Sequence, residues 1–306
     1  MNITLVPDGP LDARATLARY RTWGEDPANR VEDGVFRRVL KFEGRLVPYE
    51  VRWQGAVDEP RLLLRAAGAR GARAEAALVR ETRAVFGLDF DLPGFYRMAK
   101  GDAVLAELTT RLHGLRPTVT PDPFEMLVHA IGAQQVNLTF AFTLRARLIR
   151  RYGTPVAVAG GLVFAFPEAG AVARARPATL RAMQYSTSKA VALRGVAAAL
   201  AGGGLDAGAL AAADDAAVIT RLTALHGIGR WTADWFLARC LGRGAVCPAG
   251  DLAVRKAFEH HWGRGRRLEE TAIRRRAAAW GPYQSLAVHY LLAGMRLARP
   301  SVGGGT

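Results

Sequence analysis

Residues 1 to about 66 read as β-strands separated by turn residues. Residues 35–42 and 45–53 are apolar and β-branched runs on either side of Glu43-Gly44, a pattern typical of a β-hairpin. Further elements predicted here are a strand at 60–65 and helices at 11–21 and 72–86. The pattern predicts a small α+β domain with an antiparallel sheet.

From about residue 100 the apolar positions recur with helical spacing. Phe124, Leu127, Val128 and Ile131 fall on one helix face, and residues 121–123 (Pro-Asp-Pro) form a helix start signal. Further helices are predicted at 138–151, 168–175, 189–201, 214–224, 230–241, 251–261, 269–279 and 283–297. If this helical region forms two lobes, the cleft between them is the natural place for a site.

Four segments follow from this pattern. We expect an α+β domain over 1–105, a helical lobe over 106–225, a hairpin and helical segment over 226–300 that packs with the other lobe, and a flexible tail over 301–306.

The composition indicates a polyanionic partner. The formal net charge is +15, and arginine supplies all but four of the 42 basic residues. Such an excess attracts nucleic acid, although coding bias also produces arginine-rich chains. The apolar runs are short and broken by arginine, and the N-terminus lacks an export signal. We therefore expect no membrane partner and a cytoplasmic protein that associates with the nucleoid through DNA.

The sequence predicts neither a catalytic metal nor a required cofactor. No His/Cys/Asp cluster has metal-ligand spacing. Cys240 and Cys247 are too few for a disulfide framework or an iron–sulfur cluster, so we interpret them as buried thiols.

Residues 225–233 (Leu-His-Gly-Ile-Gly-Arg-Trp-Thr-Ala) join two predicted helices through two glycines. Glycine allows positive φ and places no side chain between the backbone and a ligand. The N–H groups of Gly227 and Gly229 are then positioned to bind a phosphate at the start of the next helix. Taken alone, the pattern is equally compatible with a tight interhelical turn.

A Gly/Pro-containing loop, residues 246–250, leads from that helix to Asp251. An aspartate at this place caps the helix that begins at Leu252, and capping is compatible with a catalytic role. The combination of hairpin, helix, Gly/Pro loop and aspartate resembles the helix-hairpin-helix–GPD superfamily of DNA glycosylases.

The resemblance covers nearly the whole chain and is closest to the alkylation-repair branch, DNA-3-methyladenine glycosylase II. It includes residues 114–117, 122–125, 130–136, 152–153, 164–167 and 186–190. It implies that the N-terminal sheet resembles half of the TATA-binding protein and that a two-lobed helical region follows. It also implies a monomer that binds double-stranded DNA containing alkylated bases, with no obligate protein partner.

The resemblance assigns roles to individual residues. Trp231 stands where bifunctional members carry a nucleophilic lysine, so no strand-nicking activity is expected. Trp231 and Trp235, one helical turn apart, are implied to line the base pocket, where indoles suit a cationic base; most such pairs are simply core aromatics. At Leu292 well-known members have a further pocket tryptophan, so the pocket is either less tightly stacked or rebuilt with Tyr20, Trp23 or Tyr283.

Two further sets of residues are implied to meet DNA or an ion. Gln135 occupies the wedge position that fills the gap left by an extruded nucleotide, although a solvated pair with Gln134 is the simpler interpretation. The expected DNA contacts are Gly227, Ile228, Gly229, Thr232, Gln134 and Gln135. Backbone carbonyls of Thr223, Leu225 and Ile228 are implied to hold a structural Na⁺ or K⁺ in the hairpin.

These roles lead to a mechanistic expectation with three rivals. The enzyme flips out 3-methyladenine- or 7-methylguanine-type lesions and hydrolyses the N-glycosidic bond, while Asp251 stabilises an oxocarbenium-like transition state. The rivals are a non-catalytic binder of distorted DNA, a glycosylase for a deaminated or oxidised base, and a basic helical scaffold for RNA.

Overall fold

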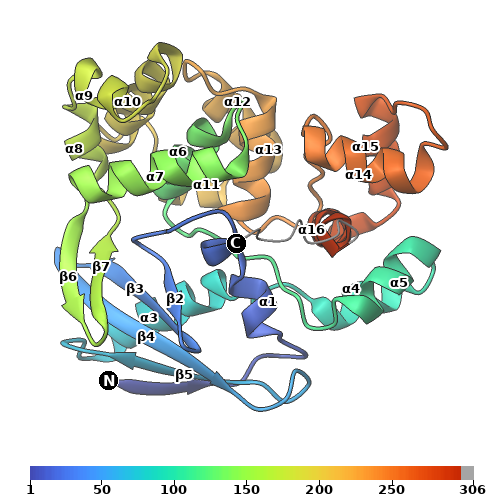
Figure 1. The fold of residues 1–306 in the computed structure, drawn as a ribbon, viewed down its shortest axis with the longest axis horizontal. Helices are drawn as coiled ribbons and strands as arrows, with labels where there is room; N and C mark the ends of the chain where they lie inside the picture. The colour runs from blue at the N-terminus through green and yellow to red at the C-terminus, as the bar shows by residue number, and fades with distance from the viewer. Residues whose placement is uncertain (298–306) are drawn as a thin grey trace, which may run out of the picture.

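The computed structural model, which describes residues 1–297, has an α+β domain below two helical lobes (Figure 1). The five-stranded antiparallel sheet has the order β1-β5-β4-β3-β2. Its strands are β1 (Asn2–Leu5), β2 (Arg30–Glu32), β3 (Val35–Phe42), β4 (Arg45–Gln54) and β5 (Arg61–Ala66). The helices of this domain are α1 (Ala13–Leu17), α2 (Arg19–Thr22) and α3 (Ala72–Val85). The predicted hairpin is confirmed, because Phe42 pairs with Arg45 across the turn.

The first helical lobe surrounds one apolar core. Its helices are α6 (Pro123–Ala133), α7 (Leu138–Tyr152), α8 (Ala169–Ala173), α9 (Pro177–Ala182), α10 (Thr187–Ala201), α11 (Ala207–Ala212), α12 (Asp215–Thr223) and α13 (Arg230–Arg239). The predicted face of α6 is buried in that core through Phe124, Leu127, Val128 and Ile131.

The second lobe combines helices from two distant parts of the chain. They are α4 (Leu92–Ala99), α5 (Ala103–Arg111), α14 (Leu252–Trp262), α15 (Glu270–Ala278), the short 3₁₀ helix η1 (Gly281–Tyr283) and α16 (Gln284–Leu297). Phe95 and Leu105 share a core with Phe258 and Tyr290. No helix of residues 1–297 has the length and apolarity that crossing a membrane requires.

This grouping differs from the predicted segments 1–105, 106–225 and 226–300. Helix α4 packs with the C-terminal helices because its apolar face is buried against α16, whereas α13 stays with the first lobe. The chain therefore enters the second lobe, leaves it and returns. The predicted tail, 301–306, lies outside the described residues, as do residues 298–300.

A second hairpin, which the pattern did not predict, lies between the predicted helices at 138–151 and 168–175. Strands β6 (Thr154–Val158) and β7 (Gly161–Ala165) pair with each other, and Val163 and Ala165 pack on Val39 of the main sheet. The strands are short, and the residues around them include Gly153, Gly160 and Pro167. In the sequence pattern such residues indicate turns between helices, so the strands are not predicted. The first lobe thus rests on the sheet through this hairpin.

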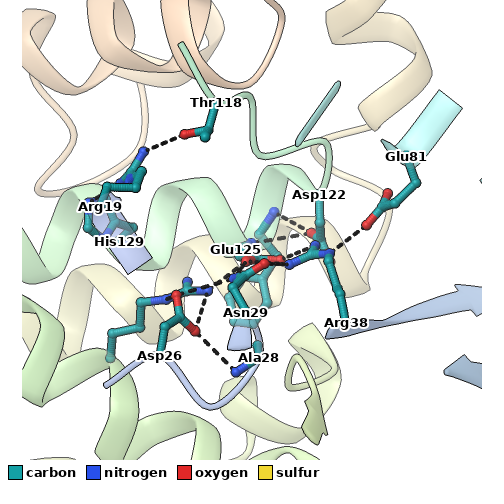
Figure 2. A network of polar contacts seen from close by, with 12 residues as sticks. Arg19, Asp26, Ala28, Asn29, Arg38, Glu81, Thr118, Asp122, Glu125 and His129 are labelled. Carbon is teal, nitrogen blue, oxygen red and sulfur yellow. Dashed lines mark hydrogen bonds and ion pairs between the residues drawn. The ribbon is translucent and has the colours of Figure 1, made fainter. Parts of the chain in front are cut away.

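A buried ion network connects the sheet domain to the first lobe (Figure 2). Glu125 of α6 is 1% exposed and accepts hydrogen bonds from Arg38 at 2.6 Å and Arg145 at 2.6 Å. Asp26 binds the other side of Arg145 at 2.9 Å, and Asn29 donates to both acids. Burial by itself raises the pKa of Glu125, but the two guanidinium groups outweigh it and hold that pKa well below its ordinary value.

We expect Glu125→Gln to lower the free energy of unfolding by about 3–5 kcal/mol, because it leaves two buried arginines short of a counter-charge. Urea unfolding at neutral pH measures this loss. The control is Glu168→Gln, whose exposed carboxylate pairs with Lys41 at 3.3 Å and whose loss should cost less than about 1 kcal/mol. Equal losses in the two variants would contradict the role of the network.

Candidate active site

Asp251 lies at the N-terminus of α14, where its carboxylate caps the helix. One carboxylate oxygen, Oδ1, accepts the backbone N–H groups of Ala253 at 2.8 Å and Val254 at 3.0 Å. These are two of the N–H groups that a helix start leaves without a partner. The predicted capping role is therefore confirmed, and it fixes one edge of the carboxylate.

The other oxygen, Oδ2, faces the two tryptophans of α13. It accepts the indole N–H of Trp231 at 2.7 Å and that of Trp235 at 3.2 Å. Their spacing of four residues puts both side chains on one helix face. Both rings are half-buried, and Trp235 packs against the cores of both lobes. The two indoles are thus hydrogen-bond donors to Asp251, a role that periodicity alone does not predict.

An ion cluster fixes the loop that delivers Asp251. Arg274 of α15 donates to the Asp234 carboxylate of α13 at 2.7 Å, to Glu270 at 2.7 Å and to the backbone carbonyl of Cys247 at 3.0 Å. Asp234 is 1% exposed and also accepts from Arg230 at 2.8 Å. This cluster joins the helix of the tryptophans to the loop before the aspartate. The sequence pattern did not predict this cluster, although Arg230 and Asp234 stand at the spacing of a helical ion pair.

The predicted hairpin connects α12 to α13. Gly227 has φ +79°, and a Cβ there would lie 2.6 Å from the Cβ of Ala192. The side chain of Ile228 is buried in the first-lobe core and anchors the turn. Gly229 is extended at the N-terminus of α13, and a Cβ there would meet nothing within 4 Å. The protein therefore requires glycine at 227, whereas at 229 the space lies open toward solvent.

Gln134 and Gln135 follow α6 and play different parts. The Gln134 amide donates to the carbonyl of Gly227 at 3.0 Å and to the Thr232 hydroxyl at 3.3 Å, so it braces the hairpin. Thr232 itself is buried. Gln135 is exposed and has φ +56°, a left-handed conformation that costs a non-glycine residue free energy. Strain of this kind is typical of functional positions.

The remaining candidates for the base pocket lie in different parts of the fold, and not all of them are near Asp251 and its two tryptophans. Leu292 is half-buried on α16 at the edge of the second-lobe core, against which Trp235 also packs. Tyr20 is buried in the sheet domain, where its ring centroid lies 6.0 Å from that of Phe36, so the structure does not bring it to Asp251. Tyr283 donates its hydroxyl to Asp91, and Trp23 is half-buried at the end of α2.

The carbonyls expected to hold a monovalent cation lie where α12 ends. The last carbonyls of a helix lack intrahelical partners, which suits Thr223. The Leu225 carbonyl accepts the N–H of Ile228 at 3.1 Å and keeps a second lone pair. The donor set consists of neutral backbone oxygens and so fits Na⁺ or K⁺.

The chain is similar to known proteins in sequence and in fold. Residues 128–282 match the family model described as HhH-GPD superfamily base excision DNA repair protein. The chain is 31% identical over 206 residues to the DNA-3-methyladenine glycosylase of Bacillus subtilis (strain 168), an alignment that covers 67% of this chain and 68% of the relative.

Solved structures share the fold. The 3-methyladenine DNA-glycosylase from Archaeoglobus fulgidus superposes with a TM-score of 0.87 and 25% identity, covering 98% of this chain and 100% of that one. The 8-oxoguanine glycosylase/lyase of Clostridium acetobutylicum in complex with double-stranded DNA superposes with a TM-score of 0.75 at 15% identity, over 96% and 98% of the two chains, and shows the fold alone. From its matched residues and its overall fold, the chain belongs to the HhH-GPD superfamily of base excision DNA repair proteins.

Proposed function

We propose that the protein is a monofunctional DNA glycosylase that removes alkylated purines of the 3-methyladenine and 7-methylguanine type. The observation that carries this proposal is the Asp251 carboxylate, held between two indole N–H groups of the helix that follows the hairpin and the N-terminus of α14. The names of the relatives from Bacillus subtilis and Archaeoglobus fulgidus support the choice of lesion.

The reaction begins with extrusion of the damaged nucleotide from double-stranded DNA. Flipping costs a few kcal/mol, and least for a base whose pairing is already damaged. The hairpin N–H groups bind the DNA backbone without reading its sequence. Gln135, exposed and in a strained conformation beside the hairpin, is the side chain we assign to the gap left in the duplex. The protein acts as a monomer in this scheme.

Asp251 then stabilises the positive charge that develops on the deoxyribose as the base departs. A carboxylate has about four lone-pair sites, and four N–H donors already bind this one. The group therefore keeps its negative charge in a fixed position but has no free site at which to take a proton from water. This favours electrostatic stabilisation over general-base catalysis. A cationic methylated purine is already a good leaving group and needs no separate acid.

A monovalent cation fits the hairpin carbonyls of Thr223, Leu225 and Ile228, where it would supply positive charge next to a DNA phosphate. The chain's own contribution is the turn that carries these carbonyls, anchored by the buried Ile228 side chain.

We expect Asp251→Asn to release alkylated base at least about a hundredfold more slowly while it still binds lesion DNA, because the fixed negative charge is lost. Asparagine remains a good helix N-cap, so the fold is retained. Single-turnover base release, with products identified by chromatography, measures the effect.

The matched control is Asp214→Asn, which changes a second N-cap aspartate, bonded to the N–H of Ala217 at 2.7 Å, and should leave release unchanged. Near-normal release by Asp251→Asn would refute the mechanism. DNA binding by the wild-type protein without any base release would instead identify a non-catalytic binder of damaged DNA.

Gly229→Ala should weaken binding to duplex DNA by about tenfold, since its methyl group fits the protein but stands where a phosphate approaches the hairpin. Fluorescence anisotropy at fixed salt measures the affinity. Gly195→Ala, another glycine with open space around it, serves as the control. Unchanged binding by Gly229→Ala would show that DNA does not approach this turn.

The protein should leave the strand intact after base release, because Trp231 stands where a lysine would form a Schiff base. Abasic product should break only on heating in alkali, and borohydride should trap no covalent complex. Strand cleavage without alkali, together with a trapped complex, would overturn the monofunctional assignment.

A further inference from the structure

Arg239 is bonded differently from the other buried arginines of residues 1–297. Five are buried, of which Arg38 and Arg145 bind carboxylates and Arg116 binds four backbone carbonyls. Arg37 also has a donor without a hydrogen-bond partner, its Nε, but the Glu50 carboxylate lies 3.7 Å from that atom. Arg239, 7% exposed, has no carboxylate within salt-bridge distance, and its buried Nη1 has no hydrogen-bond partner. A buried donor without a partner costs free energy, so its retention calls for a reason.

His289 of α16 holds this guanidinium in place. The Nη2 of Arg239 lies 2.9 Å from Nδ1 of His289. Burial and the adjacent Arg239 hold the pKa of His289 well below its ordinary value, so the ring is neutral and its Nδ1 accepts the hydrogen bond. Burial, Arg19 and Arg296 lower the pKa of Arg239 to about 9, which still leaves it protonated at neutral pH. The result is a fixed cation with one N–H group unpaired.

This cation lies beside the candidate active site. Arg239 is one turn beyond Trp235 on the same face of α13, and its guanidinium lies 5.7 Å from the centroid of the Trp235 ring. The indole N–H of Trp235 binds Asp251. A single indole therefore contacts both the carboxylate and the arginine. His289 and Leu292, the predicted pocket residue, are also one turn apart on one face of α16.

We propose that the free N–H of Arg239 binds the exocyclic carbonyl of the extruded base, so that the pocket favours guanine-derived over adenine-derived lesions. This inference rests on the proposed glycosylase function. With the sugar at Asp251, the edge of a purine farthest from its glycosidic bond carries the substituent at position 6. In guanine-derived bases that substituent is a carbonyl acceptor, whereas in adenine-derived bases it is an amino donor.

The base edge fits this donor better than a DNA phosphate does. Arg239 is more than nine-tenths buried between α13 and α16, whereas the hairpin presents its N–H groups at the surface. The guanidinium of Arg239 already places a cation over the Trp235 ring, so this indole face is less available to a cationic base. The pocket thus selects the base less by stacking a charged ring on Trp235 and more by a hydrogen bond from Arg239 to a carbonyl.

The test uses methylated duplex DNA, which contains both 7-methylguanine and 3-methyladenine in one substrate. We expect Arg239→Met to lower the ratio of initial release rates, 7-methylguanine over 3-methyladenine, by about tenfold or more, the scale of one lost charged contact to a base. Arg239→Lys, which keeps the charge but shortens the reach of the donor, should lower the ratio in the same direction.

The matched control is Arg243→Met, which changes an arginine four residues after Arg239 and past the end of α13. Arg243 donates to the carbonyls of Ala211 and Ala213, and the ratio of this variant should equal that of the wild type. Thermal unfolding of each variant reports whether it folds. A wild-type ratio in folded Arg239→Met or Arg239→Lys would overturn the inference, while failure of the wild-type protein to release either base would overturn the proposed function instead.

Discussion

Four N–H groups from the two helical lobes converge on the carboxylate of Asp251. The indoles of Trp231 and Trp235 belong to the first lobe, and the backbone N–H groups of α14 belong to the second. Because each lobe supplies two donors, the carboxylate keeps its orientation only while the lobes keep their relative position. The negative charge on which the proposed chemistry depends is therefore placed by the packing of the two lobes, and not by the helix cap alone.

Buried polar contacts maintain that position. Arg274 joins α13, α15 and the loop before Asp251, while Arg239 and His289 join α13 to α16. The ion pairs Arg38–Glu125 and Asp26–Arg145 connect the sheet domain to α6 and α7 (Figure 2). Removing one member of such a pair leaves an unpaired charge or donor, so these contacts favour one arrangement of the three units. The Nη1 of Arg239 remains an unused donor beside the site.

Local pattern predicted much of this structure. The hairpin around Glu43-Gly44, most helices after residue 100, the glycine turn and the capping role of Asp251 all follow from residues close together in the chain. Pattern did not predict β6 and β7, the return of α4 to the C-terminal lobe, or the burial of Tyr20 against Phe36. These features depend on which apolar surfaces meet across long sequence separations. For the same reason the sequence alone does not reveal the hydrogen bonds from both indoles to Asp251 or the lack of a carboxylate near Arg239.

The central claim is that Asp251 offsets a positive charge on the sugar. Its most direct test is the affinity for duplex DNA in which a cationic pyrrolidine replaces the deoxyribose of the lesion, compared with a neutral tetrahydrofuran at the same place. The wild-type protein should bind the cationic analogue at least about a hundredfold more tightly, as expected for a transition-state mimic, and Asp251→Asn should lose that preference. Equal affinity of the wild-type protein for the two analogues, or a preference that survives in Asp251→Asn, would contradict the account.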